Sequence, residues 1–441
     1  MVFLTLVLIA ITSYICDYKI PAIVLLFFLL TSGFNLIPEE MMDIGFISKG
    51  ADYAFFILIG IIITDSFFLK NYLRPDKLVI WLMVLGGFLL VCIVNSKFVL
   101  GLSWGEVIRT SRYQYFWLAY FVFRNMEREP LEKILKILCN ITVVLSFLFL
   151  LQIVLSTSIL NKSMVISTQL FGMKIPRFYN QPDMLHFFTF MAIYNNPNKG
   201  KWKIITKIIL VLALVGAFHR SLIGMFVLTM LIGYTLKLPR LRRIMVLSSL
   251  AFVLAGIIAI AGTSFVRSKT YVDLQNISSG NFADVSEIDP DVFRKSTFTF
   301  RLALLFERNQ YLLEHPKSMF IGAGLLAEDS KQVNQMFDFQ IGLADIVTNQ
   351  TMQLDSPDIS YSSLLLRMGY LGTLLYLSLF IYLMVFFYKH KENKYGLFSF
   401  LFLVLSMGTS FFSANLLMPI TYMLPLMSYT IIQKEKHDTT S

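Results

Sequence analysis

Long runs of apolar residues recur along almost the whole chain and are separated by short polar stretches. A transmembrane helix needs about 20 apolar residues, because the hydrocarbon core of a bilayer is about 30 Å thick. Backbone polar groups in lipid must be satisfied within the segment, so each run predicts a helix. The runs are 1–16, 20–37, 51–69, 78–95, 110–123, 134–155, 183–195, 204–218, 221–236, 244–262, 361–388, 395–411 and 414–432. The pattern predicts an all-α, polytopic transmembrane bundle of about 12 helices.

The composition supports a membrane protein. Of the 441 residues, 56% are hydrophobic and 15% are charged, whereas about 25% are charged in soluble domains. The three cysteines, Cys16, Cys92 and Cys139, show no paired spacing, which argues against a disulfide framework or a zinc site. The net charge of +10 would suit a nucleic-acid partner, but the basic residues gather in short connections between the apolar runs. We therefore expect no nucleic acid.

Basic residues fall on alternate connections between the predicted helices. The basic stretches are 70–77, 124–133, 199–203, 237–243, 389–394 and the tail 433–436. Cytoplasmic loops carry an excess of Lys and Arg, so the face that holds these stretches is predicted to be cytoplasmic. The opposite, outer face then holds fewer basic residues, among them Arg109, Arg112, Arg177 and Arg220.

One connection on the outer face is far longer than the others. Residues 262–360 contain no membrane-length apolar run and are rich in acidic residues. An insert of this size is usually a functional element. We predict one integral membrane domain, 1–441, with 262–360 inserted as a large extracytoplasmic loop. Within this loop, 300–314 has the spacing of an amphipathic helix that ends at His315 and Pro316, and the glycines of 321–324 predict a turn.

Arg220 is the clearest candidate for a functional charge. It lies between two apolar runs, where a charge costs several kcal/mol unless it is paired or faces a water-filled cavity. The alternative is a hairpin turn whose arginine reaches the headgroups, with His219 simply flanking it. Arg177 precedes the run at 183–195, and its alternative role is an interfacial anchor beside Tyr179.

Arg301 and Arg308 are seven residues apart and share one face of the predicted loop helix. Paired arginines suit a diphosphate, because a guanidinium is a planar fork of donors that stays charged. The alternative is a solvated face balanced by Glu307 and Glu314, and for Arg308 this alternative is favoured.

Asp355 and Asp358 directly precede the apolar run that begins at Tyr361. A carboxylate there is commonly a helix cap, but it could also act as a general base toward a sugar hydroxyl. No zinc-protease, nucleotide-binding or serine-hydrolase motif occurs, and no cluster of Asp, His or Cys suggests a metal site. We therefore expect neither a metal nor a cofactor.

The order of these landmarks over 170–385 resembles the O-antigen polymerase and O-antigen ligase superfamily. Arg177 with Gln181 to Asp183 is similar to the outward arginine of the family and its proline step. His219 to Ser221 is similar to the family's Ser-Arg turn between two helices. Arg301, followed by His315, Pro316 and the glycines at 322 and 324, resembles the loop helix and its ending. Asp358, Tyr361 and the glycines at 369 and 372 resemble the opening of the next helix.

The resemblance implies a metal-independent glycosyltransferase in the bacterial cytoplasmic membrane, with its active site on the outer side. Members bind undecaprenyl-diphosphate-linked oligosaccharides as donor and acceptor. The other implied partners are membrane lipid, a chain-length regulator and a flippase. By position, Arg220 and Arg301 would hold the diphosphate, and Asp358 would act as the base or orient the acceptor. Arg177, Arg308, His219 and Asp355 are the predicted substrate-binding residues.

Ligases of this superfamily carry a histidine where Asp358 stands, so the resemblance favours polymerisation of repeat units over transfer to a lipid A core. A transporter or flippase of lipid-linked sugars is the alternative from a different class. Transporters usually hold ionisable groups near the midplane and show related halves. Here acidic residues are almost absent from mid-helix positions, Asp65 lies toward a predicted cytoplasmic end, and no internal repeat is visible.

Overall fold

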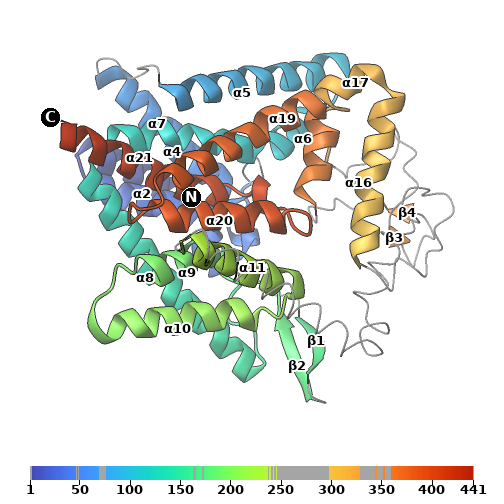
Figure 1. Cartoon of the computed structure of the whole chain (residues 1–441). Helices are drawn as coiled ribbons and strands as arrows, with labels where there is room; N and C mark the ends of the chain where they lie inside the picture. The colour runs from blue at the N-terminus through green and yellow to red at the C-terminus, as the bar shows by residue number, and fades with distance from the viewer. Residues whose placement is uncertain are drawn as a thin grey trace.

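The computed structural model of the chain is predominantly helical, and most of its long helices run side by side in a bundle (Figure 1). It describes residues 2–45, 47, 49–68, 76–161, 165–170, 173–236, 238–239, 242, 245, 297–327, 343–344, 351–352 and 359–440. For residues 165–170, 173–175, 220, 297–300, 302–303, 343–344, 351–352 and 437–440 the structure describes the backbone alone. The predicted helix at 244–262 and most of the predicted loop lie outside the described residues.

Most of the described helices follow the apolar runs, but the run at 110–123 is divided among three shorter helical segments. In the first half they are α1 (Val2–Ile15), α2 (Lys19–Leu30), α3 (Ser32–Asn35), α4 (Gly50–Phe68), α5 (Lys77–Val94), α6 (Trp104–Ser111), α7 (Ala119–Asn125) and α8 (Arg128–Leu155). The others are α9 (Leu185–Tyr194), α10 (Gly200–Gly216), α11 (Arg220–Leu236), α16 (Thr297–Glu314), α17 (Pro316–Ile321), α19 (Ser360–Lys389), α20 (Gly396–Thr409) and α21 (Ile420–Thr440). Short helical turns are η1 (Glu39–Met41), η2 (Asn95–Val99), η3 (Arg112–Leu118) and η5 (Asn415–Leu417).

In the described part of the chain, four helices are long and apolar enough to cross a membrane: α4, α5 with η2, α8 and α19. The helices α1, α2, α9, α11 and α20 are apolar but shorter. The helical fold class is therefore confirmed, and the helices are compatible with a membrane protein. The number of about 12 spans stays a prediction.

Two short β-ribbons were not predicted from the sequence. Strand β1 (Val165–Leu170) pairs antiparallel with β2 (Met173–Phe178), and Ile166 lies opposite Arg177. Strands β3 (Leu343–Ala344) and β4 (Thr351–Met352) form a second antiparallel pair within the predicted loop. Apolar periodicity did not reveal β1 and β2, because the hairpin precedes the helix α9 without an apolar run of its own.

The centre of the bundle is an aromatic cluster where η3, α19 and α21 meet. The ring of Trp117 stacks on that of Tyr422 with centroids 4.2 Å apart, and Phe380 packs edge-on against Trp117. The hydroxyl of Tyr376 donates to the Leu416 carbonyl (2.6 Å). Buried aromatic rings contribute large apolar areas, and a buried tyrosine hydroxyl needs such a partner. The cluster holds three segments distant in sequence in one arrangement.

Helix α19 is interrupted where α17 packs against it. Gly369 has φ +63° and ψ −170°, a conformation that essentially only glycine adopts. A Cβ on Gly369 would lie 2.6 Å from the carbonyl carbon of Phe320, and a Cβ on Gly322 would lie 2.5 Å from that of Arg367. The two glycines thus let two backbones touch, and we call this contact the glycine junction. The turn predicted at 321–324 is confirmed.

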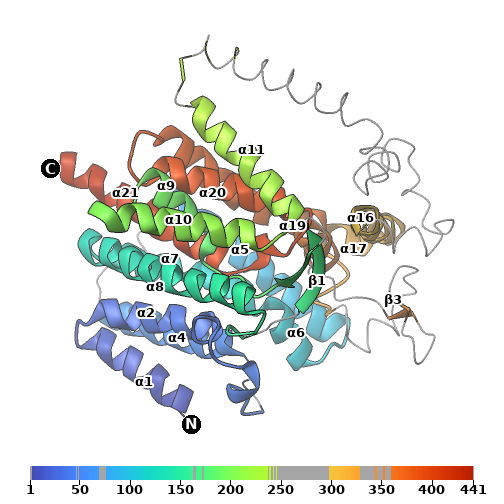
Figure 2. The ribbon, with the colours of Figure 1, turned by 90° about the horizontal axis from the view of Figure 1, so that it is seen from below.

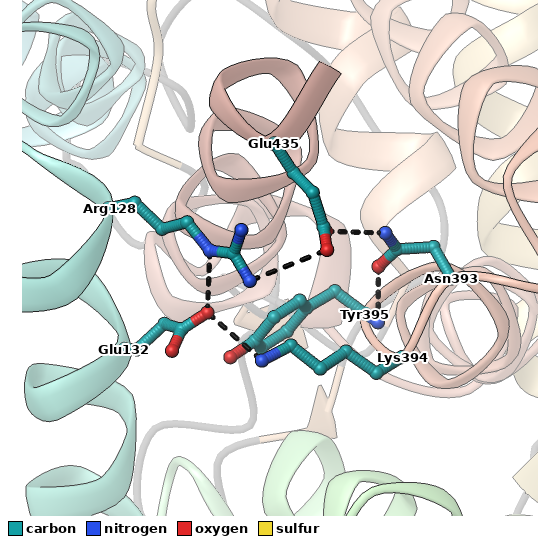
Figure 3. Close-up of polar contacts among 6 residues, drawn as sticks. All are labelled: Arg128, Glu132, Asn393, Lys394, Tyr395 and Glu435. Atoms are coloured by element: carbon teal, nitrogen blue, oxygen red, sulfur yellow. Dashed lines mark hydrogen bonds and ion pairs between the residues drawn. The ribbon is translucent and has the colours of Figure 1, made fainter. Parts of the chain in front are cut away.

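A polar cluster joins α8, α21 and the connection between α19 and α20 at one end of the bundle (Figure 3). Arg128 bonds Glu132 (2.9 Å) and Glu435 (3.4 Å), and Lys394 bonds Glu132 from the other side (3.0 Å). These residues come from the predicted cytoplasmic stretches 124–133, 389–394 and 433–436. The prediction that these stretches share one face is confirmed, because their side chains are in contact. Which side of a membrane this end faces stays a prediction.

Gly369→Ala is expected to lower the free energy of unfolding by about 1–3 kcal/mol, because alanine is strained in this backbone conformation. Thermal unfolding in detergent, followed by intrinsic fluorescence, measures the change. Gly87→Ala in α5 is the matched control, because no atom lies within 4 Å of its added Cβ, and alanine there stabilises by up to about 1 kcal/mol. Equal Tm values for the two variants would show that the junction contributes nothing.

Labelling of introduced cysteines tests the predicted orientation, because Cys16 is exposed while Cys92 and Cys139 are buried. In a Cys16→Ser background, Lys394→Cys should react with a membrane-impermeant maleimide only after spheroplasts are permeabilised, because Lys394 belongs to the basic face. Asp43→Cys, in the exposed connection before α4, is the matched probe and should react on intact spheroplasts. The reverse pattern would invert the predicted topology.

Candidate functional site

A cavity of about 200 Å³ lies at the end of the bundle opposite the polar cluster of Figure 3. Its charged lining residues are Lys49, Arg109, Arg112 and Arg367, and its described lining includes no carboxylate. We call it the basic pocket. Helix α19 connects the two ends. Arg367 lies near its start, and Lys389 is its last residue, after which the chain continues to Lys394 of the polar cluster.

Five separate stretches of chain build the basic pocket. Lys49 directly precedes α4, Arg109 and Thr110 lie in the last turn of α6, and Arg112 begins η3. Ser363 and Arg367 come from the start of α19, and Ala414 and Leu417 come from η5 and its flank. Local sequence supports this arrangement: Ser103 accepts a hydrogen bond from Glu106 N (3.2 Å) and so caps α6.

Arg112 is paired with Asp52 of α4. Its Nη1 atom lies 3.2 Å from Asp52 Oδ2, and the two side chains are only 12% and 17% exposed. Asp52 also accepts a hydrogen bond from the backbone N of Lys49 (3.2 Å). One carboxylate therefore orients two of the cationic segments. Lys49 Nζ also lies 4.0 Å from Glu39 Oε2, outside the described lining of the pocket.

Residues 323–327, which follow α17, reach the pocket lining at Ala327, and we call them the strap. Side chains from three elements hold the backbone of the strap. Leu325 N donates to Ser96 Oγ of η2 (2.8 Å), and Leu325 O accepts from Thr110 Oγ1 of α6 (2.9 Å). Ala327 N donates to Glu106 Oε1 of α6 (3.2 Å), and Leu326 O accepts from Arg367 Nε of α19 (3.0 Å). Ala323 N also donates to Leu366 O beside the glycine junction (2.7 Å). Buried backbone groups need such partners, so the strap is tied to η2, α6 and α19.

Two buried polar atoms of the lining residues have no hydrogen-bond partner among the described residues. They are Nε of Arg112 and the hydroxyl of Ser363, whose side chain is 1% exposed. Buried polar groups are nearly always paired, so such atoms indicate a position for water or a ligand. Guanidinium groups and a hydroxyl are all donors toward an anion. The arrangement is suited to a group with several anionic oxygens, such as a phosphate or diphosphate.

The structure places Arg177 and His219 together, away from the basic pocket. Arg177 in β2 donates from Nε to the Ala217 carbonyl (3.3 Å), and its guanidinium lies 4.5 Å from the Tyr179 ring. The predicted contact with Tyr179 is confirmed. His219 Nδ1 lies 2.9 Å from Ser221 Oγ and accepts from Leu222 N (3.4 Å), which caps α11. Two landmarks of the resemblance are therefore in one place.

Arg308 corrects one prediction. Its side chain is fully buried where α16 packs against α19, rather than on a solvated face. The predicted balance by Glu307 is confirmed, since the two side chains form an ion pair. A buried charge needs such a partner because desolvation is costly. Arg301, on the same helix, is half-buried, and neither arginine lines the basic pocket in the described part of the chain.

The remaining predicted site residues lie outside the described residues. These are the side chain of Arg220 and the whole of Asp355 and Asp358. The backbone of Arg220 begins α11 as predicted. The expected meeting of Arg220 with Arg301 stays a prediction, as does the role of Asp358.

Sequence reasoning missed the four cations of the basic pocket as a group. Arg109 and Arg112 were assigned to the outer face but not to a site. Arg367 carried a clear signal, because it is a charge within an apolar run of membrane length. Lys49 had none, since a lysine before a helix is ordinary.

Comparison of the sequence with models of known protein families and with curated proteins gives no match. In the described part of the chain, no group of three or more His, Cys, Asp or Glu residues is placed to hold a metal ion.

Asp52→Asn is expected to destabilise the fold by about 1–3 kcal/mol, because it leaves the largely buried Arg112 without its carboxylate. Adding Arg112→Gln should recover part of that loss, which a double-mutant cycle of unfolding free energies measures. Asp17→Asn is the control, because Asp17 pairs with Lys19 while 86% exposed, and it should change stability by less than about 1 kcal/mol. Additive effects of the two substitutions would mean that the pair is not coupled.

Proposed function

We propose that this protein is a glycosyltransferase that polymerises lipid-diphosphate-linked oligosaccharide units at the outer face of the bacterial cytoplasmic membrane. The observation that carries the proposal is the basic pocket, where Lys49, Arg109, Arg112 and Arg367 meet at the end of the bundle opposite the basic connections. Under the positive-inside rule that end is the outer one. The cavity is lined by four cations and by no described carboxylate, and guanidinium groups around a cavity are suited to a phosphate ligand.

A diphosphate leaving group fits the chemistry of this pocket. A guanidinium fork binds paired oxygens of a phosphate through two parallel hydrogen bonds, and its charge persists at any physiological pH. As the glycosidic phosphate bond breaks, negative charge grows on the departing diphosphate. Fixed cations aimed at that charge stabilise the transition state more than the ground state. The pocket cations can therefore stabilise the departing diphosphate, and the proposed step does not require a metal.

In the proposed reaction, the hydroxyl oxygen of the acceptor sugar forms a bond to the anomeric carbon of the donor. The bond between that carbon and the phosphate oxygen breaks, and the lipid diphosphate leaves with the electron pair. The hydroxyl proton passes to a base, for which we propose Asp358. This residue directly precedes Ile359, from which α19 continues to Ser363 and Arg367 in the pocket wall.

Two contacts of the fold also support the resemblance to the O-antigen polymerase and ligase superfamily. The glycine junction joins the loop-helix ending at Gly322 to the helix opening at Gly369, and Arg177 reaches the turn before Arg220. Each contact joins two landmarks that are far apart in the sequence. Arg220 and Arg301 remain proposed diphosphate contacts, in addition to the cations of the basic pocket.

Reconstitution in liposomes with a lipid-linked repeat unit tests the proposal. The wild type should produce a ladder of products without any lipid A core acceptor. Arg367→Gln and Arg109→Gln should each reduce the rate by about 100-fold, the usual effect of losing one donor to a developing anion. Arg109→Lys should lose less than Arg109→Gln, because it keeps the charge but not the fork.

Arg128→Gln is the matched control, because it removes an arginine from the opposite end of the bundle. It should leave the product ladder unchanged. Unchanged ladders in both pocket variants would refute the proposed site. Products that form only when a lipid A core acceptor is added would identify a ligase. A transporter would be identified if cells that carry the pocket variants accumulated lipid-linked substrate inside while their polymer length stayed unchanged.

A further inference from the structure

The segment between α5 and η3 is too short to cross a membrane, yet it exposes large apolar side chains. After α5 ends at Val94, the chain makes the turn η2, changes direction at Gly101 with φ +71°, and forms α6. The eight residues of α6 span about 12 Å, since a helix rises about 1.5 Å per residue. Figure 2 shows α6 at the end of the bundle that also carries α17 and β1.

Helix α6 has two different faces. Val107, Thr110 and Ser111 are buried, and Thr110 is tied to the strap. Trp104 and Ile108 are each 49% exposed, and a spacing of four residues puts them on one side of the helix. The inner face belongs to the wall of the basic pocket, and the outer face leaves about half of Trp104 and of Ile108 exposed.

The turn before α6 extends this outer face. Phe98 is 71% exposed, Val99 is 74% exposed, and the Phe98 and Trp104 rings meet edge-on with centroids 6.2 Å apart. The Lys97 ammonium lies 5.5 Å from the Trp104 ring centre and donates to the Leu102 carbonyl (3.0 Å). The surface is therefore apolar and aromatic with a cation at its edge.

The same surface continues onto α5. Leu90, Val91 and Val94 at the end of α5 are exposed, and α5 with η2 is one of the helices long and apolar enough to cross a membrane. Apolar side chains on a span face lipid, so the surface that continues from them is covered by the same solvent. Tryptophan beside a basic side chain is typical of the headgroup boundary.

We infer that η2 and α6 form an interfacial anchor, which lies in the plane of the bilayer with Trp104 and Phe98 at the boundary between headgroups and acyl chains. Lys97 and Arg109 are then at the depth of the lipid phosphates, whose charge they complement. Because Arg109 and Thr110 also line the basic pocket, the anchor fixes the pocket at that same depth.

This depth selects the ligand class. A phosphate or diphosphate attached to a lipid lies at the headgroup layer while its hydrocarbon chain stays in the bilayer. Such a group reaches the pocket by lateral diffusion, whereas a soluble sugar phosphate gains nothing from the anchor. The ligand class rests on the proposed function, but the seating of α6 in the interface does not.

Depth-dependent quenching of Trp104 fluorescence tests the anchor. The full-length protein and its Trp104→Phe variant are reconstituted in vesicles of phosphatidylcholine and phosphatidylglycerol, and the difference between their spectra isolates Trp104. An interfacial side chain lies about 5–10 Å below the headgroup surface. Lipids brominated near the glycerol end of the chain should therefore quench the difference signal more than lipids brominated near the chain end, and aqueous iodide should quench it little. Phe98→Trp in the Trp104→Phe background should restore the same profile.

Three outcomes would overturn the anchor. Quenching of the Trp104 signal by iodide but not by brominated lipid would place α6 in water. Strongest quenching by bromine at the chain end would place α6 in the centre of the bilayer. Quenching by neither reagent would mean that protein covers Trp104. The outcome is independent of the activity test. If lipid quenches Trp104 while the pocket variants remain active, the anchor stands and the proposed function is refuted. If lipid does not quench Trp104 while the pocket variants lose activity, the proposed function stands and the anchor is refuted.

Discussion

The glycine junction is the contact on which the basic pocket depends. Gly322 and Gly369 have no Cβ, so the chain after α16 can touch α19 backbone to backbone. That approach breaks α19 and leaves the Leu366 carbonyl to accept a hydrogen bond from Ala323. The strap then continues along α6 and closes the pocket at Ala327. With any larger residue at the junction, two helices would separate and the strap would lose its register.

The second constraint is the cost of charge beside the apolar helices, which are compatible with a membrane protein. At one end, the ion pairs among Arg128, Glu132, Lys394 and Glu435 link α8, α21 and the connection before α20 (Figure 3). At the other end, Arg112 pairs with Asp52 and Lys49 Nζ lies 4.0 Å from Glu39 Oε2, but the cavity lining itself holds four cations and no described carboxylate. A closed network of ion pairs has structural value, while cations that surround a cavity are suited to an anionic ligand. The end with the polar cluster is therefore interpreted as structural, and the end with the basic pocket as the candidate binding site.

The fold could be predicted further than the site. Apolar runs located most of the described helices to within a few residues, since a helix in lipid must satisfy its own backbone hydrogen bonds. The run at 110–123 is the exception, because the chain there forms the end of α6, η3 and α7. The loop helix and its end at His315 were also predictable from local spacing. The β1–β2 hairpin was not, nor was the burial of Arg308. Both depend on which surface packs against them, and a local pattern does not contain that information.

The sequence by itself determined a helical protein whose apolar helices are compatible with a membrane, the meeting of three of its basic connections, and the places where glycine and proline interrupt its helices. These properties follow from hydropathy, charge and backbone sterics, which act over a few neighbouring residues. Only the tertiary structure decided that Lys49, Arg109, Arg112 and Arg367 share one cavity. Their segments are separated by up to several helices, and a contact across that separation is selected by packing rather than by spacing along the chain.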